Sequence, residues 1–413
     1  MVKVTRRKQN KQPNKKKEIS IRRRKKCSRI VIKDENENEN DNRSDEFDKL
    51  PIDVLTCIFL KCGLKTLSIS RCVSKSWNDC IISPLFVFSR RKQEGNAPEF
   101  LFVETSRYLP RSSKSKLQFV SLDMDGRNED LYTILNYPDT QIHCNGWTVS
   151  AGLVCLSTAC RIYLCNPAIH QLRELPNSSP SATPGYEHFG FGYLPSKKEY
   201  KVLHFFYLGP PRGLALEIDV ALIRCEVFTL SSSGGISNGR WKEIAEQPPY
   251  HPIFRGVLVN ECLYWLGKDK IVYVGQPRIM SFDFENEKFI SLGFPSASMN
   301  CHGLNLMDLK GSLCVADRVN FRKSSILDLW ILKDKVRCVW AKEYSIDFGV
   351  RFDPMTLDCF HSTWNEEIVF RQEVGAMMII FFYDIKRKTF RQVQRHRAAP
   401  ISIYWKTCFS LDA

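Results

Sequence analysis

The sequence lacks long apolar runs and recognisable catalytic motifs. Its longest uninterrupted apolar stretch, Ala376–Tyr383, has eight residues, whereas a membrane-spanning helix needs about 20. No apolar stretch follows the basic start of the chain, so we expect neither a transmembrane helix nor a secretory leader. There is no Gly-x-Ser-x-Gly elbow and no Gly-x4-Gly-Lys-Ser/Thr phosphate loop. We therefore predict a protein that is not an enzyme, with no catalytic residues and no cofactor.

Spacings typical of metal sites are also missing. The chain has 16 cysteines but no Cys-x2-Cys pair, and its closest series is Cys155-x4-Cys160-x4-Cys165, within apparent strands. The eight histidines are scattered along the chain. We interpret these residues as structural, and the cysteines as reduced and mostly buried thiols of a cytosolic or nuclear protein. No metal site is predicted.

The charge of the chain is concentrated in two opposite blocks near its start. Residues 1–33 carry 15 Lys/Arg and one acid, and residues 34–48 carry eight acids and one Arg. Such blocks contain too few apolar residues to offset the entropy cost of ordering. We therefore expect residues 1–47 to form a disordered tail, basic and then acidic.

The basic block has three interpretations. Lys15–Lys17 and Arg22–Lys26 resemble a nuclear-import signal. The alternative is a solvated, flexible tail that carries no targeting signal. Phosphate contacts with nucleic acid are a third interpretation, which the lack of interleaved aromatic residues disfavours. We expect the protein in the nucleus, the cytoplasm or both.

A small helical module is expected over residues 48–90. Val54/Ile58 and Leu55/Phe59 are spaced at i and i+4, which predicts one apolar stripe on a first helix. A second helix follows over 65–73. Its inward apolar positions are predicted to be Leu67, Ile69 and Val73.

A third helix completes this module. Ser74 can cap its start, Trp77 and Ile81 lie one turn apart, and Pro84 ends it. Three helices in about 35 residues bury too little apolar surface to be stable alone. We expect the module to lean on a partner or on the following domain.

The residues of this module resemble the F-box of plant F-box proteins. The matching residues are Leu50-Pro51-x-Asp53-x-Leu55-x2-Ile58-Phe59, Leu64-x2-Leu67, Arg71-Cys-Val-Ser-Lys-Ser-Trp77 and Ser83-Pro84-x-Phe86. In that family the module docks on a Skp-type adaptor, which bridges to a cullin. The resemblance implies adaptor contacts from Leu50, Pro51, Leu55, Ile58, Leu67, Val73 and Trp77. For Leu55, Val73 and Trp77, a role in the module's own core stays open.

Residues 99–413 read as a β-rich repeat array. Cys165-Asn166-x5-Leu172, Phe282-Asp283-x5-Phe289 and Tyr383-Asp384-x5-Phe390 share one pattern, which predicts hairpins whose turns begin at Asn or Asp. Gly152, Gly256 and Gly311 precede similar apolar strands. The spacing suggests about six units of about 50 residues, which is the size of a kelch-type propeller blade.

The order of motifs resembles an F-box followed by the F-box-associated domain of plants. Gly152-Leu-Val-Cys-Leu156, Cys165-Asn166-Pro167, Leu175-Pro176, Phe191-Gly192-Tyr193 and Glu199-Tyr-Lys-Val202 follow that pattern in sequence. The resemblance implies a mainly β fold with a small α module, namely a three-helix F-box and a kelch-like propeller that holds substrate proteins.

The resemblance implies a substrate receptor of a Skp-cullin-F-box ubiquitin ligase, with an unidentified target protein as its second partner. The alternative is a propeller scaffold or a nucleic-acid-associated protein that uses the basic tail. Membrane partners are not expected, and nucleic acid is the less favoured partner. Candidate target-binding loops are Leu208–Gly213, Pro248–Arg255 and Arg318–Lys323.

Overall fold

The structure is a computed structural model that describes part of the chain. It covers residues 50–412 except 92–97, 107–115, 124–127, 136–141, 159–160, 183–186, 210–221, 232–235, 237–238, 269–277, 297–298, 300–302, 350–351, 353–356, 363–366, 376 and 398–400. Residues 51–413 form one compact unit. The expected disordered tail at 1–47 and its import signal lie outside the described residues. Among the described helices, none has the length and apolar character that crossing a membrane requires.

The N-terminal module consists of four short helices. They are α1 (Ile52–Leu60), α2 (Leu64–Ser70), α3 (Lys75–Ile82) and α4 (Pro84–Arg91). Ser74 caps α3 as predicted, because its Oγ accepts a hydrogen bond of 3.2 Å from the backbone N–H of Trp77. Pro84 follows the end of α3 but also begins α4, a helix that the sequence analysis missed. Proline fits a first helical turn because its missing N–H needs no partner there.

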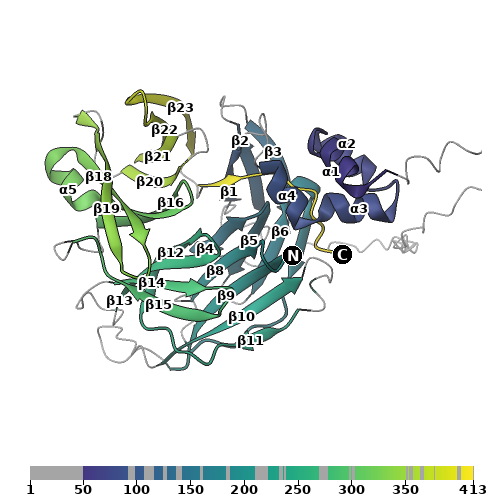
Figure 1. Ribbon diagram of the computed structural model, residues 1–413, viewed down its shortest axis with the longest axis horizontal. Coiled ribbons are helices and arrows are strands. Elements are labelled where there is room, and N and C mark those ends of the chain that lie inside the picture. The colour runs from purple at the N-terminus through teal and green to yellow at the C-terminus, as the bar shows by residue number, and fades with distance from the viewer. Residues whose placement is uncertain are drawn as a thin grey trace, which may run out of the picture. The chain divides into compact units, whose positions relative to one another are not determined.

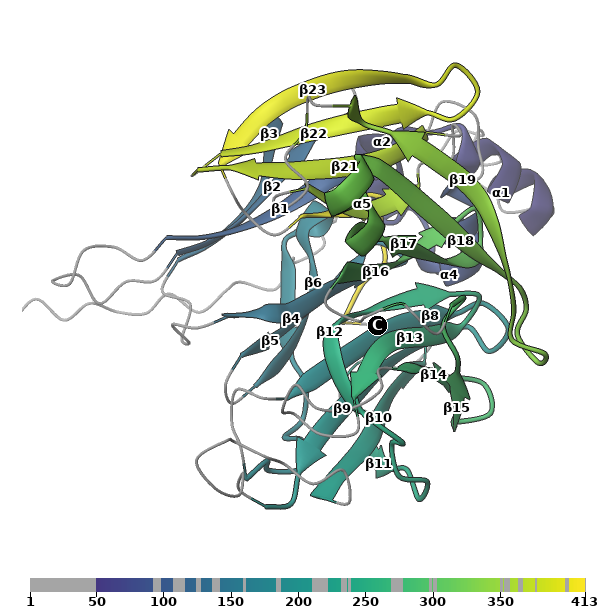
Figure 2. The same ribbon diagram turned by 90° about the vertical axis from the view of Figure 1, so that its left-hand side faces the viewer.

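The rest of the chain forms six antiparallel sheets of four strands each (Figures 1 and 2). The first half of the array consists of β1 (Glu99–Ser106), β2 (Lys116–Leu122), β3 (Asn128–Leu135), β4 (Ile142–Ser150), β5 (Leu153–Thr158), β6 (Ile162–Asn166), β7 (Gln171–Glu174), β8 (His188–Leu194), β9 (Glu199–Tyr207), β10 (Ile223–Ser231) and β11 (Trp241–Glu243).

The second half of the array completes the six sheets. It consists of β12 (His251–Val259), β13 (Cys262–Lys268), β14 (Arg278–Asp283), β15 (Lys288–Leu292), β16 (Leu304–Leu309), β17 (Ser312–Asp317), β18 (Ile326–Asp334), β19 (Val339–Asp347), β20 (Leu357–Ser362), β21 (Glu367–Val374), β22 (Met377–Asp384), β23 (Thr389–Arg397) and β24 (Ile401–Tyr404). A 3-10 turn, η2 (Pro167–Ile169), links β6 and β7, and helix α5 (Arg318–Ser324) packs on β18 (Figure 2). The prediction of a mainly β fold with about six blades is confirmed.

The ring is built on the first strand of each sheet. β4 lies against β8, β8 against β12, β12 against β16 and β16 against β20, and β24 lies against β4. β24 also pairs with β1, with Phe100 opposite Ile403. The innermost strand of the first blade therefore comes from residues 401–404, near the C-terminal end of the chain. The resulting closure protects the edges of the array.

The predicted Asn/Asp hairpins join the third and fourth strands of their blades. Asp384 Oδ1 accepts from the backbone N–H groups of Lys386 (2.9 Å) and Arg387 (2.8 Å), and Asp283 and Asn166 bond their own turns similarly. In each case the residue four positions on is left-handed, as at Lys388 (φ 55°). Asp334 begins a fourth such hairpin that the sequence pattern missed.

The glycine pattern was only partly correct. Ala151–Gly152 and Lys310–Gly311 are two-residue turns with positive φ at both positions, as a hairpin between right-handed twisted strands requires. Gly256 instead lies inside β12, where a Cβ would come within 2.5 Å of the Trp265 indole nitrogen. The equivalent turn in that blade is Asn260–Glu261.

Candidate docking surface on the helical module

The four helices surround a small apolar core. Leu55 and Phe59 of α1 and Leu67 of α2 are 4%, 2% and 1% exposed. Phe59 also packs edge-to-face on Trp77 of α3, with ring centroids 5.0 Å apart. The interior of the module is thus filled by one side of α1 together with Leu67 of α2, Ile81 and Ile82 of α3, and Phe86 and Val87 of α4.

The same module also exposes large apolar side chains. Among the described residues the structure has 13 exposed large apolar side chains. Six of them fall in the short stretch from α1 to the start of α4, and they are Ile52, Val54, Ile58, Ile69, Val73 and Leu85. We call these six residues the apolar face. Concentrated exposed apolar residues typically mark a protein-binding site.

The apolar stripe predicted for the first helix therefore has two halves. Leu55 and Phe59 point into the module, whereas Val54 and Ile58 are 44% and 46% exposed. The expectation that Ile69 and Val73 point inward with Leu67 was wrong, because they are 63% and 62% exposed. Helical periodicity identifies the apolar positions, but it does not say which of them a partner covers.

The seven residues predicted to contact an adaptor are divided between surface and core. Pro51, Ile58 and Val73 are exposed, and Leu50 and Trp77 are half-buried. Leu55 and Leu67 lie in the core, from which a side chain supports a docking surface without reaching a partner. The structure also exposes Ile52, Val54, Ile69 and Leu85 on the same module, and the i, i+4 spacing of Val54 and Ile58 was the sequence signal for one of them.

The cysteine series in the second blade does not converge on one point. Cys155 of β5 and Cys165 of β6 are buried in two different apolar clusters, on opposite faces of the sheet. Burial raises the pKa of both thiols well above the ordinary value. Cys160 lies outside the described residues. In the part of the chain that the structure describes, no group of three or more His, Cys, Asp or Glu side chains could hold a metal ion.

Two of the three candidate target-binding loops are partly or wholly regular structure. Arg318–Lys323 forms most of helix α5, and within Pro248–Arg255 only residues 248–250 precede strand β12. Of Leu208–Gly213, only Leu208 and Gly209 are described, and Leu208 is 54% exposed. Composition alone did not show which of these segments are loops, because Arg and aromatic residues occur in loops, strands and helices alike.

Comparisons with known proteins match both parts of the chain. Residues 101–410 match the family described as F-box associated beta propeller domain, and residues 47–89 match the F-box domain. F-box protein At1g30790 of Arabidopsis thaliana is 26% identical over 73% of this chain and 76% of its own length. F-box protein CPR1 of the same plant is 26% identical over 72% of this chain and 73% of its length.

One relative is named after a kelch repeat. F-box/kelch-repeat protein At4g19930 of Arabidopsis thaliana is 21% identical over 93% of this chain and 94% of its own length. The matches therefore extend across the helical module and the sheet array together.

Proposed function

Because the chain belongs to the family of F-box proteins that carry an F-box associated beta propeller domain, we propose that it is a non-catalytic substrate receptor of a Skp-cullin-F-box ubiquitin ligase. The F-box docks on a Skp-type adaptor, and through it on a cullin, while the propeller holds a target protein. The receptor contributes proximity, because it brings target lysines near an activated ubiquitin. Ubiquitin transfer belongs to the other subunits.

The observation that carries this proposal is the apolar face of the F-box. Its six members leave 44% to 63% of their surface exposed in a module that already has a filled core, so a large apolar area stays available to a partner. Burying one Leu-sized side chain in a partner contributes roughly 1.5–3 kcal/mol. A groove that covers several of them accounts for tight docking.

The adaptor test uses substitutions at the start of α1. Pro51 is exposed and Leu50 half-buried, so we expect the double variant Leu50→Ala, Pro51→Ala to weaken adaptor binding by about 10- to 100-fold, since each 1.4 kcal/mol is tenfold. Ile58→Ala is expected to act in the same direction. Calorimetry of the purified protein against the adaptor measures both.

A matched control separates docking from general surface apolarity. Val336, at the tip of the β18–β19 hairpin, is 95% exposed, and Val336→Ala should leave adaptor affinity unchanged. Wild-type affinity in both F-box variants, with the helices still folded by circular dichroism, would remove the adaptor from the proposal.

We propose further that the target binds on the side of the propeller with the longer connections. Within a blade, the first-to-second and third-to-fourth strand turns emerge on one side, and several have only two to four residues. Most connections on the opposite side are longer, although β5–β6 and β21–β22 are joined by only three and two residues; residues 244–250 between β11 and β12 are one described example of a longer connection. Long loops on a rigid scaffold are usual sites of recognition.

The target itself can be found by affinity purification with mass spectrometry after proteasome inhibition. Replacing Pro248, Pro249 and Tyr250 with Gly-Ser-Gly should then lower recovery of the target while adaptor binding persists. Full recovery of the target by this variant would place its binding site elsewhere.

We also propose that the basic block directs nuclear import. Residues 1–33 carry 15 Lys/Arg against one acid, which suits recognition by an import receptor. Deleting residues 1–33 should move a fluorescent fusion from nucleus to cytoplasm. If the fusion keeps its distribution between nucleus and cytoplasm, the tail carries no targeting signal.

A further inference from the structure

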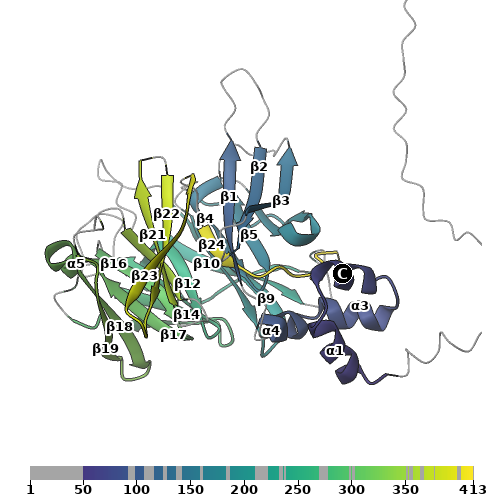
Figure 3. The ribbon, with the colours of Figure 1, turned by 90° about the horizontal axis from the view of Figure 1, so that it is seen from above.

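The last residues of the chain form an extended segment that continues beyond the ring-closing strand. We call residues Trp405–Asp412 the strap. It leaves β24 in the first blade and crosses to the second blade, as the yellow segment in Figures 1 and 3 shows. Residues Thr407–Leu411 are all buried, with exposures from 1% to 8%. The strap is therefore covered by the rest of the protein on both of its sides and is not an exposed tail.

One side of the strap enters the apolar cluster between the second and third blades. Phe409 and Leu411 are 1% and 2% exposed and belong to this cluster, which is formed by β5 and β6 of the second blade and by β8, β9 and β10 of the third. The Phe409 ring lies 5.0 Å from that of Tyr200 on β9. Gly152 allows the approach, because a Cβ there would lie 2.4 Å from Thr407 Cγ2. The strap is therefore an integral part of the propeller core.

Polar side chains of the second blade bond the strap along its length. Asn166, which is fully buried, donates through Nδ2 to the carbonyls of Thr407 (3.1 Å) and Phe409 (2.7 Å). Gln171 accepts from the backbone N–H of Leu411 at 2.8 Å. These bonds satisfy strap backbone groups that have no strand partner.

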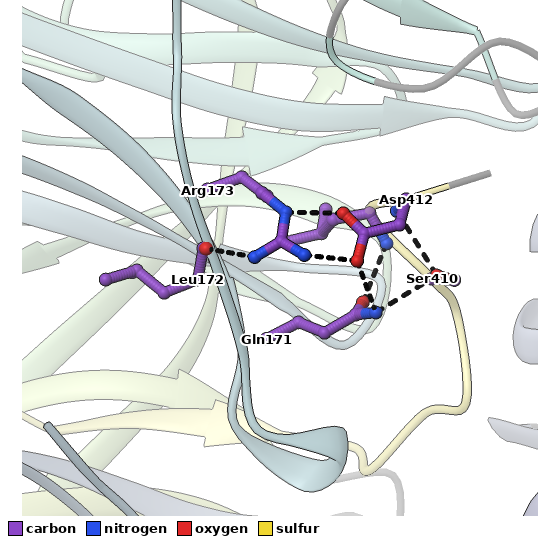
Figure 4. Close-up of polar contacts among 6 residues, drawn as sticks. Gln171, Leu172, Arg173, Ser410 and Asp412 are labelled. Carbon is purple, nitrogen blue, oxygen red and sulfur yellow. Dashed lines mark hydrogen bonds and ion pairs between the residues drawn. The ribbon is translucent and has the colours of Figure 1, made fainter. Parts of the chain in front are cut away.

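The end of the strap is held by charge (Figure 4). The Arg173 guanidinium donates to both carboxylate oxygens of Asp412, a two-bond geometry that fixes orientation as well as distance. Gln171 Nε2 donates to Ser410 Oγ (3.1 Å) and to Asp412 Oδ2 (3.3 Å). Residues of β7 thus receive the last side chains of the chain.

The other side of the strap meets the F-box. The Cys408 Sγ lies 3.7 Å from Ser68 Oγ of α2 and 4.0 Å from the Leu64 carbonyl oxygen. Cys408 is only 3% exposed, and burial raises the pKa of its thiol, with Ser68, Arg71 and Arg90 opposing the rise. The Cys408 side chain is thus buried where the strap meets α2.

We propose that the strap is an intramolecular lock that couples the F-box to the closed propeller. Phe409 and Leu411 fix the strap between the second and third blades, and Cys408 lies against α2 on the other side. Release of the strap from the second blade then releases α2 as well. The device adjusts how rigidly the adaptor end is held relative to the target end, and it stands whether or not the adaptor assignment is correct.

Thiol labelling of the full chain tests the lock directly. Labelling of a buried thiol follows the population of the open state. In the wild type, exposed Cys57 should react with a maleimide at once, while Cys408 and the core thiol Cys165 are protected. Phe409→Ala should raise the Cys408 rate by about tenfold or more, since it deletes a buried aromatic ring. Cys165 lies in the other apolar cluster of the second blade and should stay protected, which distinguishes strap release from unfolding of the blade.

The Arg173–Asp412 ion pair allows a second test, in which one substitution breaks the pair and a charge exchange restores it. Arg173→Asp should raise Cys408 labelling several-fold, and the exchange Arg173→Asp with Asp412→Arg should restore protection. A rate that the exchange does not lower would show that the pair does not hold the strap.

Coupling to the F-box requires a second readout, because a strap could open without affecting α2. Hydrogen exchange of the α2 amides should accelerate in Phe409→Ala, and Ser68→Glu should in turn raise Cys408 labelling, since coupling is reciprocal. Thr66→Glu, at an exposed position of the same helix, is the matched control and should leave Cys408 protected. Unchanged α2 exchange with a labelled Cys408 would overturn the proposal.

Discussion

The Glu226 carboxylate of β10 shows how a single buried side chain holds a connection between blades. It is 3% exposed, accepts from the backbone N–H (2.8 Å) and Oγ (2.9 Å) of Ser179, and lies 2.9 Å from His204 Nδ1. Burial raises the pKa of Glu226, but the hydrogen bonds from His204 and Ser179 outweigh it and hold the pKa below its ordinary value. The carboxylate thus fixes the segment that joins the second and third blades.

This arrangement predicts a pH dependence of stability. A carboxyl whose pKa is lower in the folded state stabilises the fold above its unfolded-state pKa, and that contribution is lost as the pH falls through the folded-state pKa. Glu226→Gln should lower the free energy of unfolding at neutral pH by roughly 2 kcal/mol and flatten its decline below about pH 4.3. Urea unfolding at a series of pH values measures both effects.

Glu174 provides the control for this experiment. Its pair with Arg161 is well exposed, with the two side chains 38% and 50% exposed, and exposed ion pairs contribute little. Glu174→Gln should therefore reproduce the wild-type pH profile. A Glu226→Gln profile that runs parallel to the wild type would contradict the role given to this carboxyl.

At the scale of elements, the Asp-initiated hairpins shape the outer half of the blades. Asp384 bonds two backbone N–H groups of its turn, so Asp384→Ala should destabilise the protein by about 1 kcal/mol. Arg387→Ala distinguishes this cause from the Asp384–Arg387 ion pair, whose atoms lie 3.8 Å apart with the Arg side chain 82% exposed. The arginine variant should cost almost nothing in denaturant unfolding. An equal cost in both variants would assign the stability to the ion pair.

The same hairpins show how far a sequence reveals such a fold. Asn166, Asp283 and Asp384 act within their own turns, so their pattern is visible in the sequence. Gly256 acts through the distant Trp265, and therefore its apparent match to the turn glycines was misleading. Repeats identify local geometry, whereas close approaches between strands depend on the assembled sheet.

The helical module and the strap set a similar limit on sequence analysis. Ile69 and Val73 are exposed because other residues, among them Leu55, Phe59 and Leu67, occupy the core of the module. The strap alternates apolar and polar residues over only a few positions, which identifies an extended segment but not the blade that receives it. Asn166 and Arg173, the residues of this blade that bind the strap, lie more than 200 residues earlier in the chain.

At the scale of the whole molecule, the ring depends on the last strand. β24 supplies the inner edge of the first blade, and Ile403 belongs to the apolar cluster of Phe100 and Phe382. Truncation after Pro400 should expose this cluster and the edge of β1, so the protein should aggregate. Light scattering and the melting temperature measure the effect.

Truncation after Trp405 provides the comparison, because it keeps β24 but removes most of the strap. It should stay monomeric more readily than truncation after Pro400, although with a lower melting temperature. A soluble, monomeric protein with an unchanged melting temperature after truncation at Pro400 would refute closure by this strand.

The pairing of β1 with β24 also sets the order of events during synthesis. Glu99 pairs with Tyr404, so the first blade waits for its inner strand until about 300 further residues are made, which takes roughly 15 to 60 seconds at typical ribosome speeds. During that interval a nascent chain presents a first blade without its inner strand and an F-box without its contact to the strap. A chaperone that shields β1 on the ribosome would have its main task here, and a premature stop near the end of the message would leave a product that quality control can recognise by this open blade.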